Sequence, residues 1–478
     1  MRIEATKTAM KLGGKEIYFS NFTYDPACYY FFYIGEFKTY GLNHFVREAL
    51  QKRFPRREVR FAAIIPDVCA LNYYPDVIVI NPLCGHRSTS GRTGSQPPRT
   101  ICRVAAEQFM TAVSGSDAIR CLIADILENQ DELYLSMFES TMEMTLDQID
   151  GVSILGPDKA VARHFNSKIV QFTELAGQVP LVEGEICRGL AALLARTEAL
   201  RKSWRDGIFV SAAYSAAGVN SAVTRTSEDV LQRFTDTEQD YLITRYIPHD
   251  QDPTVLAVVA NADEVYIAGI ADQKIVDGNK FVGSSYPSRV NKDQAALLKK
   301  YTVAAGKLLG QAGYRGIFGC DYLIDSHGDI WFLEINARKQ GTTLEFCCTL
   351  EQNLPKGTPT LPELECLAVL DGHFPPGTVE MEENIRGLHW ETYNHKLTAP
   401  VLTTGSIPQN LQEREAFGKV ARRLMRKDFV ILEHLGTPLR VMPGTFLARV
   451  VSVARRREDV VEGLHRGIGL IKQTFQKI

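Results

Sequence analysis

Two carboxylates in the second half of the chain are spaced so that an antiparallel hairpin would bring them together. Residues 316–343, GIFGCDYLIDSHGDIWFLEINARKQGTT, contain two β-rich runs separated by the four-residue turn signal SHGD. If the turn is symmetric, Asp325 pairs with Ile330 and Asp321 then pairs with Glu334, with Cβ atoms about 5 Å apart on one face. Like charges so placed repel unless a cation lies between them. The spacing therefore predicts a cation site.

The second run of this hairpin has a polar face that suits a magnesium ion. Alternation along the strand predicts polar side chains on one face and apolar side chains in the core: Glu334, Asn336 and Arg338 against Leu333, Ile335 and Ala337. Carboxylate and amide oxygens are hard ligands for Mg²⁺, which completes its octahedron with phosphate and water. Asp321, Glu334 and Asn336 are therefore the predicted metal ligands, and Arg338 is predicted to stabilise a transferring phosphate or a developing oxyanion. The alternative is an ion-paired amphipathic hairpin without a metal.

Alternating helices and strands precede the hairpin and must position it. Between 151 and 352 the sequence predicts strands at 207–213, 241–247, 254–260 and 265–271, and helices at 158–176 and 292–312. Residues 1–150 show a mixed α/β pattern, and a C-terminal unit covers 381–478. The intervening 353–380 is rich in Pro and Gly and is expected to be a linker. The polar stretch 84–100 is expected to be a loop, either a solvated insertion or a flap over a substrate.

Composition and charge exclude several classes of function. The chain has 478 residues, which at about 150 residues per domain allows about three domains. Its 54 Lys and Arg against 56 Asp and Glu give a net charge of −2, so no chain-wide positive field attracts nucleic acid or an anionic membrane. No apolar run approaches the ~18 residues of a membrane span and the N-terminus is charged, so a cytoplasmic protein is expected. Ten cysteines without a CxxC pair argue against a metal knuckle or a disulfide framework.

The hairpin motif, G-x-D followed after about a dozen residues by E-I-N-A-R, resembles the metal-binding end of the ATP-grasp superfamily. Most members of that superfamily form an acyl phosphate from a carboxylate and ATP, and then pass the acyl group to an amine. The resemblance implies ATP and one or two Mg²⁺ ions, with Mn²⁺ as a substitute. It implies an α+β fold, in which an N-terminal α/β domain precedes the ATP-grasp domain and a small C-terminal α/β domain follows it.

Three upstream segments resemble the nucleotide-binding elements of the same superfamily. Residues 155–172, LGPDKAVARHFNSKIVQF, are similar to its Gly-Pro strand end and following helix, whose phosphate-binding lysine would be Lys168. Residues 209–220 resemble the strand and small-residue loop that closes over the phosphates, and the loop would be Ser215, Ala216, Ala217 and Gly218. Residues 241–247 resemble the hinge that pairs with adenine, and its contacts would be Thr244, Arg245, Tyr246 and Ile247. Asp252 lies near the acidic residue that binds ribose.

Two positions depart from the superfamily pattern. A second lysine usually lies in the strand before the phosphate loop, where this chain has Ser211, and Thr244 stands where a glutamate usually opens the hinge. Losing the lysine removes a positive charge from the nucleotide site. This departure implies weaker nucleotide binding, a substitute such as Arg163, or a degenerate domain.

The order of the predicted domains, with LGTPLRVMPGTFLARVVSVA in the last, resembles the peptide ligases of pheganomycin-type biosynthesis. That resemblance implies an ADP-forming ligase that joins a small-molecule or peptide carboxylate to an amine, in natural-product biosynthesis. A homodimer is left open. Two alternatives are an ATP-grasp kinase that phosphorylates a hydroxyl and a nucleotide-binding scaffold with a degenerate site. The arginine clusters 422–426 and 455–457 also suggest binding of a polyanion or an acidic partner, although charged runs are usually solvated.

Overall fold

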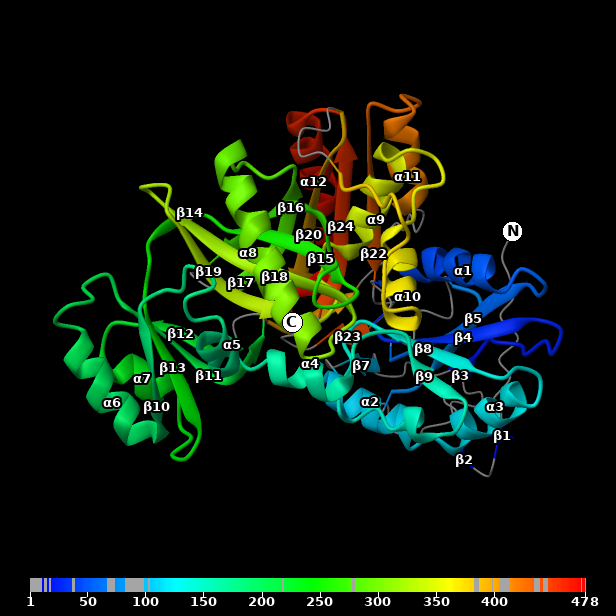
Figure 1. Cartoon of the computed structure of the whole chain (residues 1–478), viewed down its shortest axis with the longest axis horizontal. Helices are drawn as coiled ribbons and strands as arrows, with labels where there is room; N and C mark the ends of the chain where they lie inside the picture. The colour runs from blue at the N-terminus through cyan, green and yellow to red at the C-terminus, as the bar shows by residue number, and fades with distance from the viewer. Residues whose placement is uncertain are drawn as a thin grey trace. The chain divides into compact units, whose positions relative to one another are not determined.

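The computed structural model describes most of the chain and divides it into two compact units. The described residues are 11–12, 15–16, 19–36, 39–66, 74–81, 99–101, 104–216, 219–276, 280–381, 387–397, 399–403, 413–433, 439–441, 446–473 and 475–477. Unit 1 consists of residues 1–156, 344–366 and 385–478, and unit 2 of residues 157–343 and 367–384. Figure 1 labels the helices and strands of both units. None of the described helices is long and apolar enough to cross a membrane.

The smaller of two antiparallel sheets in unit 2 has four strands. Their order is β10 (Gly184–Arg188), β13 (Asp240–Arg245), β11 (Ile208–Ala216) and β12 (Val219–Thr224). Helices α6 (Gly189–Leu200) and α7 (Ser227–Arg233) cover one face of this sheet, where Ile208, Val210 and Ile243 are buried. Because successive side chains of a strand point to opposite faces, Phe209, Ser211, Leu242 and Thr244 lie on the other face.

The larger sheet of unit 2 carries the hairpin. Its strands lie in the order β14 (His249–Gln251), β18 (Gly316–Asp325), β15 (Pro253–Val259), β16 (Val265–Val276) and β17 (Lys280–Tyr286), and β19 (Ile330–Asn336) also pairs with β18. Helix α8 (Lys292–Gln311) begins with a capping box and packs on β15, β16 and β18 (Figure 1). Two short helices, α4 (Lys159–Phe165) and α5 (Lys168–Glu174), precede the sheets, and α5 contacts β19 as well as β11 and β13.

Unit 1 contains a mostly parallel sheet. Its strands lie in the order β3 (Phe19–Ser20), β6 (Val77–Val79), β5 (Val59–Ile65), β4 (Tyr29–Ile34), β8 (Leu133–Met137) and β9 (Val152–Ile154), and β3 alone is antiparallel to its neighbour. Three helices belong to this part of the chain: α1 (Leu42–Arg53), α2 (Ala106–Ser114) and α3 (Asp117–Leu127). The strands are buried on both faces, which is typical of a parallel sheet between helices.

The C-terminal part of unit 1 is antiparallel. Strand β24 (Phe446–Ala454) lies between β20 (His389–Lys396) and β22 (Lys427–Glu433). Helices α11 (Glu413–Ala421) and α12 (Arg457–Lys472) pack on these strands. Helix α9 (Thr343–Asn353) lies almost wholly in unit 1, and α10 (Leu361–Leu370) contains the boundary between the units after residue 366. The remaining strands are short: β7 (Arg99–Ile101), β21 (Val401–Thr403), β23 (Leu439–Val441), β25 (Phe475–Lys477), β1 (Lys11–Leu12) and β2 (Lys15–Glu16).

The expected α+β class is confirmed, and two local expectations are wrong. The helix expected over 158–176 is two helices, because Ser167 caps the N-terminus of α5 by accepting a hydrogen bond from the N–H of Val170. The expected linker 353–380 contains α10, in which Leu361, Leu364 and Ala368 are buried. The domain boundaries expected from the sequence, at residues 150, 352 and 380, remain predictions. The expected loop 84–100, except its last two residues, lies outside the described residues, as do Ala217 and Gly218.

Candidate functional site

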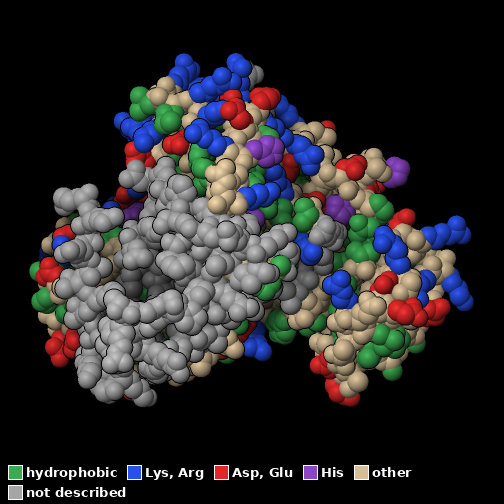
Figure 2. Space-filling view, turned by 180° about the vertical axis from the view of Figure 1, so that it is seen from behind, with side chains coloured by type: hydrophobic (Ala, Val, Ile, Leu, Met, Phe, Trp, Pro, Cys, Tyr) green, Lys and Arg blue, Asp and Glu red, His purple; other side chains and the backbone are tan. Residues whose placement is uncertain are grey.

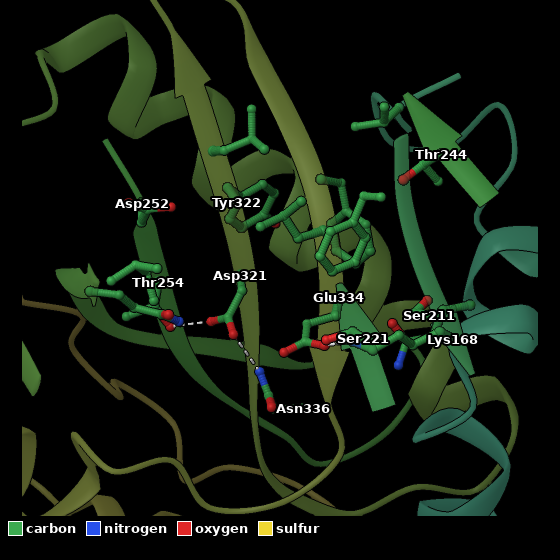
Figure 3. Close-up of a pocket in the computed structure, with 18 of the residues that line it drawn as sticks. Lys168, Ser211, Ser221, Thr244, Asp252, Thr254, Asp321, Tyr322, Glu334 and Asn336 are labelled. Atoms are coloured by element: carbon green, nitrogen blue, oxygen red, sulfur yellow. Dashed lines mark hydrogen bonds and ion pairs between the residues drawn. The ribbon is translucent and has the colours of Figure 1, made fainter. Parts of the chain in front are cut away.

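A cavity of about 290 Å³ lies within unit 2, between the free face of the smaller sheet and the hairpin of the larger one (Figure 3). One part of its lining is apolar and includes Leu181, Val182, Leu242, Ile247, Leu323 and Phe332. Another part is charged and includes Lys168, Asp321, Glu334 and Arg338. The cavity can therefore accept a molecule with a flat apolar end and a strongly charged end.

Asp321 and Glu334 are paired across β18 and β19, as the sequence predicts. The turn itself is not symmetric, because Ile324 rather than Asp325 pairs with Ile330. The register shifts by one residue beyond Asp321, at a β-bulge that contains Leu333. Leu333 is therefore 45% exposed instead of lying in the core, whereas Ile335 and Ala337 are buried as expected. The bulge restores the pairing that places both carboxylates at the cavity (Figure 3).

The outer edge of β19 is held by the segment that carries Lys168. The Gln171 amide donates to the carbonyl oxygen of Ile335 at 2.9 Å and accepts from the Ile335 N–H at 2.7 Å. Two residues further along the chain, the N–H of Ala337 donates to Asn166 Oδ1 at 3.1 Å. These side chains replace a neighbouring strand, which an edge strand otherwise lacks. They thereby fix α5 relative to Glu334.

Asp321 is buried and accepts three hydrogen bonds. Thr254 Oγ1 donates to Asp321 Oδ1 at 2.6 Å, Gln340 Nε2 donates to the same oxygen at 3.2 Å, and Asn336 Nδ2 donates to Oδ2 at 2.8 Å. Gln340 reaches this position because residue 319 is glycine: a Cβ there would lie 2.0 Å from Gln340 Cδ. The carboxylate orientation is therefore fixed by groups from β15, β19 and the segment that follows β19, and Figure 3 shows Asp321 between Thr254 and Asn336.

Glu334 forms an ion pair with Lys168, the first residue of α5. The ammonium group is largely buried, and burial lowers the pKa of Lys168 to about 8. Asp321 acts in the opposite direction, and Arg338 adds to the lowering. Lys168 thus lies at the charged part of the cavity, where an anionic ligand would raise the pKa of Lys168 and so favour its charged ammonium form.

Asn336 connects the predicted metal ligands to the predicted catalytic arginine. Its Oδ1 accepts from an Nη of Arg338 at 2.8 Å, and the other Nη of Arg338 donates to the carbonyl oxygen of Lys339 at 3.0 Å. Asn336 therefore orients both Asp321 and Arg338. The three residues lie together at one wall of the cavity, as the alternation along β19 predicts.

The hinge residues Thr244, Arg245, Tyr246 and Ile247 all line the cavity. The N–H of Arg245 donates to the Glu183 carbonyl oxygen at 2.9 Å, and that of Tyr246 donates to the Gly207 carbonyl oxygen at 3.1 Å. These two donors are already used within the protein, so they do not supply the hydrogen bonds expected for a base.

The expected ribose-binding carboxylate already has a partner. Asp252 lines the cavity and lies 2.9 Å from His249 Nε2. The hydrogen bond to Asp252 raises the pKa of His249, which favours the charged imidazolium. Sequence spacing could not reveal this ion pair.

The position in β11 where the second lysine is expected holds a neutral residue, Ser211. Ser211 is buried, lines the cavity and pairs with Ser221 across β11 and β12, and Ser221 also lines it. The suggested substitute Arg163 is not among the lining residues, and its guanidinium lies 5.5 Å from the ring centroid of Tyr214. Of the phosphate loop, Ser215 and Ala216 belong to the end of β11.

The donor set at this cavity fits a magnesium ion that is shared with a ligand. In the described ranges, this cavity included, His, Cys, Asp and Glu side chains nowhere gather in threes that could hold a metal by themselves. At the cavity the carboxylates of Asp321 and Glu334 are neighbours, and they would leave coordination positions for phosphate and water. The Asn336 amide turns its nitrogen to Asp321 and its oxygen to Arg338, so it would have to turn over to offer its oxygen to a metal. Asp321 is already oriented by hydrogen bonds, as the ligands of metal sites usually are.

Three residues that organise the site escaped the sequence analysis: Gln171, Thr254 and Gln340. Each acts on a residue that is far away in sequence or through a backbone group. Only Gln340 carried a weak signal, since it continues the polar alternation of Glu334, Asn336 and Arg338.

The chain resembles known proteins in both sequence and fold. Residues 209–342 match the model of an ATP-grasp domain. The chain is 25% identical over 209 residues to the butirosin acyl-carrier protein–L-glutamate ligase of Niallia circulans, which corresponds to 42% of this chain and 49% of the relative. The chain thus spans about half the length of the curated relative that it matches.

Two solved structures show the same fold over most of the chain. The biotin carboxylase domain of Hydrogenobacter thermophilus 2-oxoglutarate carboxylase, with Mg-ADP and bicarbonate, has a TM-score of 0.62 at 13% identity, covering 94% of this chain and 90% of that one. The Aspergillus clavatus carboxyaminoimidazole ribonucleotide synthase with ATP has a TM-score of 0.54 at 12% identity, covering 94% and 100%. The matching domain, the hairpin geometry and these likenesses show that the chain has the ATP-grasp fold, with an ATP-grasp domain at residues 209–342.

Proposed function

We propose that this chain is an ATP-dependent carboxylate–amine ligase that releases ADP. The observation that supports it most is the convergence of Asp321, Glu334, Asn336, Lys168 and Arg338 on one cavity. The aliphatic part of that cavity, with Val182, Ile247 and Leu323, suits a flat base. A nucleotide would then lie with its base among apolar side chains and its phosphates among charged ones.

The similar proteins support ATP as the nucleotide and ligation as the reaction. One solved structure contains ATP, another contains Mg-ADP, and the curated relative is named as a ligase of L-glutamate and an acyl-carrier protein. By this likeness we assign ATP to the cavity and two organic substrates, a carboxylate and an amine, to the protein. The substrates are small molecules or peptides.

The charged side chains would divide the binding of the triphosphate between them. Asp321, Glu334 and Asn336 would hold Mg²⁺, which neutralises phosphate charge when it is bound. Lys168 would exchange its bond with Glu334 for one with phosphate oxygens, because a triphosphate presents more negative charge than one carboxylate. Arg338 would donate two parallel hydrogen bonds to the phosphoryl group that is transferred.

The reaction that fits this arrangement needs no nucleophile from the protein. A carboxylate oxygen of the acid substrate attacks the γ-phosphorus in line, and the bond between that phosphorus and the ADP oxygen breaks. The amine then attacks the acyl carbon, the bond to the phosphate oxygen breaks, and a proton leaves the nitrogen. Arg338 stabilises the charge that grows on the phosphoryl oxygens during the first step.

A degenerate nucleotide scaffold is the weaker alternative, although Ser211 in place of a lysine favours it. Burying two neighbouring carboxylates is costly even though Lys168 pairs with Glu334, so their retention supports a function for the site. The experiment is an assay with ATP, Mg²⁺, a panel of amino acids and peptides, and hydroxylamine as a general amine. We expect hydroxamate and ADP in equal amounts with at least one acid. AMP as the product, or ADP without hydroxamate for every acid that stimulates turnover, would contradict the ligase.

A further inference from the structure

Two arginine-rich segments of unit 1 that are distant in sequence lie side by side. The register of β22 and β24 pairs Lys427 with Ala454, so the segments that flank these residues are adjacent. The N–H of Arg455 donates to the carbonyl oxygen of Arg426 at 3.4 Å. Figure 2 shows Lys and Arg side chains gathered over this end of unit 1, where α11 ends and α12 begins. We call residues 422–426 with 455–457 the basic patch.

Part of the charge of the basic patch has no ion-pair partner among the described residues. Arg426 pairs with Asp459 at 2.6 Å, and the neighbouring Lys427 pairs with Glu462. Within the described residues, Arg423, Arg455 and Arg456 form no ion pair. Arg456 is exposed at the N-cap of α12. The hydrogen bond from Arg426 lowers the pKa of Asp459, and the charge of Arg456 contributes to the lowering. The Arg422 guanidinium donates to a backbone carbonyl oxygen, that of Gly418, at 3.0 Å. The patch therefore keeps a positive field although the chain as a whole has a net charge of −2.

The turn in the basic patch is closed by backbone hydrogen bonds and holds an arginine where glycine is preferred. The N–H of Leu424 donates to the Lys419 carbonyl oxygen at 2.9 Å, and that of Arg423 donates to the Val420 carbonyl oxygen at 3.1 Å. This is a Schellman motif, and its left-handed residue is Arg423, with φ of 62°. A side chain in that conformation costs stability relative to glycine, so the turn alone gives no reason for an arginine.

The same turn exposes two apolar side chains at its centre. A Schellman motif usually buries the residue that follows the left-handed one, yet Leu424 is 68% exposed, and Met425 is 41% exposed. Both lie between the arginines at 423 and 426, within one short turn. Exposed aliphatic side chains surrounded by arginines are typical of the centre of a protein interface, where Met and Arg are enriched and Lys is depleted.

We propose that the basic patch docks a protein partner whose surface presents carboxylates around a small apolar centre. Arginine favours this partner, because its guanidinium binds carboxylates with two parallel hydrogen bonds. Leu424 and Met425 favour a protein over a nucleic acid, because aliphatic side chains gain nothing from a phosphate backbone. The proposal concerns unit 1 alone and does not depend on the reaction in unit 2.

The test measures binding of the whole chain to a defined probe. The probe is a fluorescent peptide of about 20 residues that forms an amphipathic helix with Glu on one face and Leu on the other. Three comparison ligands are a scrambled peptide of the same composition, a single-stranded DNA of similar charge, and phosphatidylglycerol vesicles. We expect the amphipathic peptide to bind at least about tenfold more tightly than the scrambled one, because only it presents both parts of the surface.

Substitutions separate docking from folding. Arg456→Glu and Leu424→Ser should each weaken peptide binding by about tenfold, whereas exposed controls in unit 2, Arg233→Glu and Leu297→Ser, should leave it unchanged. Arg423→Gly is the sharpest variant, because it should raise the melting temperature by about 2 °C and still weaken binding. Equal binding of both peptides, tighter binding of DNA or vesicles, or unchanged affinity in Arg423→Gly or Leu424→Ser would each overturn the proposal.

Discussion

The side-chain amide of Gln171 forms two hydrogen bonds with the backbone of Ile335: it donates to the carbonyl oxygen at 2.9 Å and accepts from the N–H at 2.7 Å. Gln171 lies on α5, which begins with Lys168, and Ile335 lies between Glu334 and Asn336 on β19. One amide side chain thus fixes the distance between the lysine and the predicted metal ligands. Neither residue carries out chemistry itself, but the geometry of the site depends on their contact.

Replacing Gln171 with leucine should therefore damage both stability and nucleotide binding. Three buried backbone groups would lose a partner, the N–H and carbonyl oxygen of Ile335 and the carbonyl oxygen of Phe165, which costs about 3 kcal/mol. We expect a lower urea midpoint and an ATP affinity about tenfold weaker, because Lys168 is no longer held beside Glu334. The matched control is Gln178→Leu, at an exposed position of the next turn, which should change neither quantity. Normal ATP affinity in Gln171→Leu would show that α5 is positioned by other contacts.

Gly319→Ala should weaken the binding of a divalent ion. Its Cβ would lie 2.0 Å from Gln340 Cδ, so Gln340 must move and Asp321 loses one of its three donors. Groups that orient metal ligands typically contribute about 10-fold or more to metal affinity. Titration of Mn²⁺ in the presence of ADP, followed by electron paramagnetic resonance, measures the effect.

A double variant provides the control for this prediction. If the alanine acts through Gln340, then Gly319→Ala combined with Gln340→Ala should bind Mn²⁺ no more weakly than Gln340→Ala alone. Additive losses would mean that the glycine is needed for another reason. Gly469→Ala, where an added Cβ meets no atom within 4 Å, should behave as the unmodified chain does.

The affinity for ATP should fall as pH rises above about 8. The pKa of Lys168 is lowered to about 8, mainly by burial, so its amine is charged below this pH and neutral above it. Phosphate stabilises the charged form, so the affinity should be constant below pH 7 and fall by up to about tenfold per pH unit above 8. Lys168→Arg should flatten the profile, because a guanidinium keeps its charge. Isothermal titration calorimetry from pH 6.5 to 9.5 measures the ATP affinity, and the exposed substitution Lys202→Arg is the control. If Lys168→Arg leaves the pH profile unchanged, Lys168 is not the group whose titration controls ATP affinity.

Arg338→Ala should reduce turnover far more than ATP binding. The guanidinium is held by Asn336 Oδ1 and the Lys339 carbonyl oxygen, beyond the predicted metal ligands, where charge grows as the phosphoryl group is transferred. Loss of one such contact typically lowers the rate roughly 100-fold, or about 3 kcal/mol. We expect kcat for hydroxamate formation to fall by that factor with ATP affinity within a few fold, and Arg338→Lys to rescue little. If Arg338→Ala keeps normal turnover at saturating ATP, Arg338 binds the nucleotide in the ground state and does not stabilise the transition state.

The hairpin shows how far sequence reasoning could reach. Alternation and spacing predicted that Asp321 faces Glu334, and the structure confirms it. The predicted symmetric turn is wrong by one residue, and the bulge at Leu333 compensates for it. The symmetry of a turn depends on neighbouring residues. The bulge depends instead on the contacts that hold the far end of β19, and these come from residues that are distant in sequence.

The groups that orient the site were beyond sequence reasoning for the same reason. Thr254 and Gln340 act on Asp321 from positions 67 and 19 residues away, and Gln171 acts on a backbone group 164 residues away. Each has an ordinary residue type at an ordinary position of a strand, a loop or a helix. By contrast, α8 and the strands expected at 207–213, 241–247 and 254–260 were predicted to within a few residues, because periodic patterns and caps are local.

The transfer of oxygen from the acid substrate to phosphate tests most directly whether this site makes an acyl phosphate. The acid that gives hydroxamate is supplied with ¹⁸O in both carboxylate oxygens, together with ATP, Mg²⁺ and hydroxylamine, and the phosphate released is analysed by mass spectrometry. Attack of the carboxylate on the γ-phosphorus predicts one ¹⁸O in each phosphate formed, and none in ADP. Phosphate without ¹⁸O, or ¹⁸O in AMP, would contradict the role proposed for Asp321, Glu334, Asn336 and Arg338.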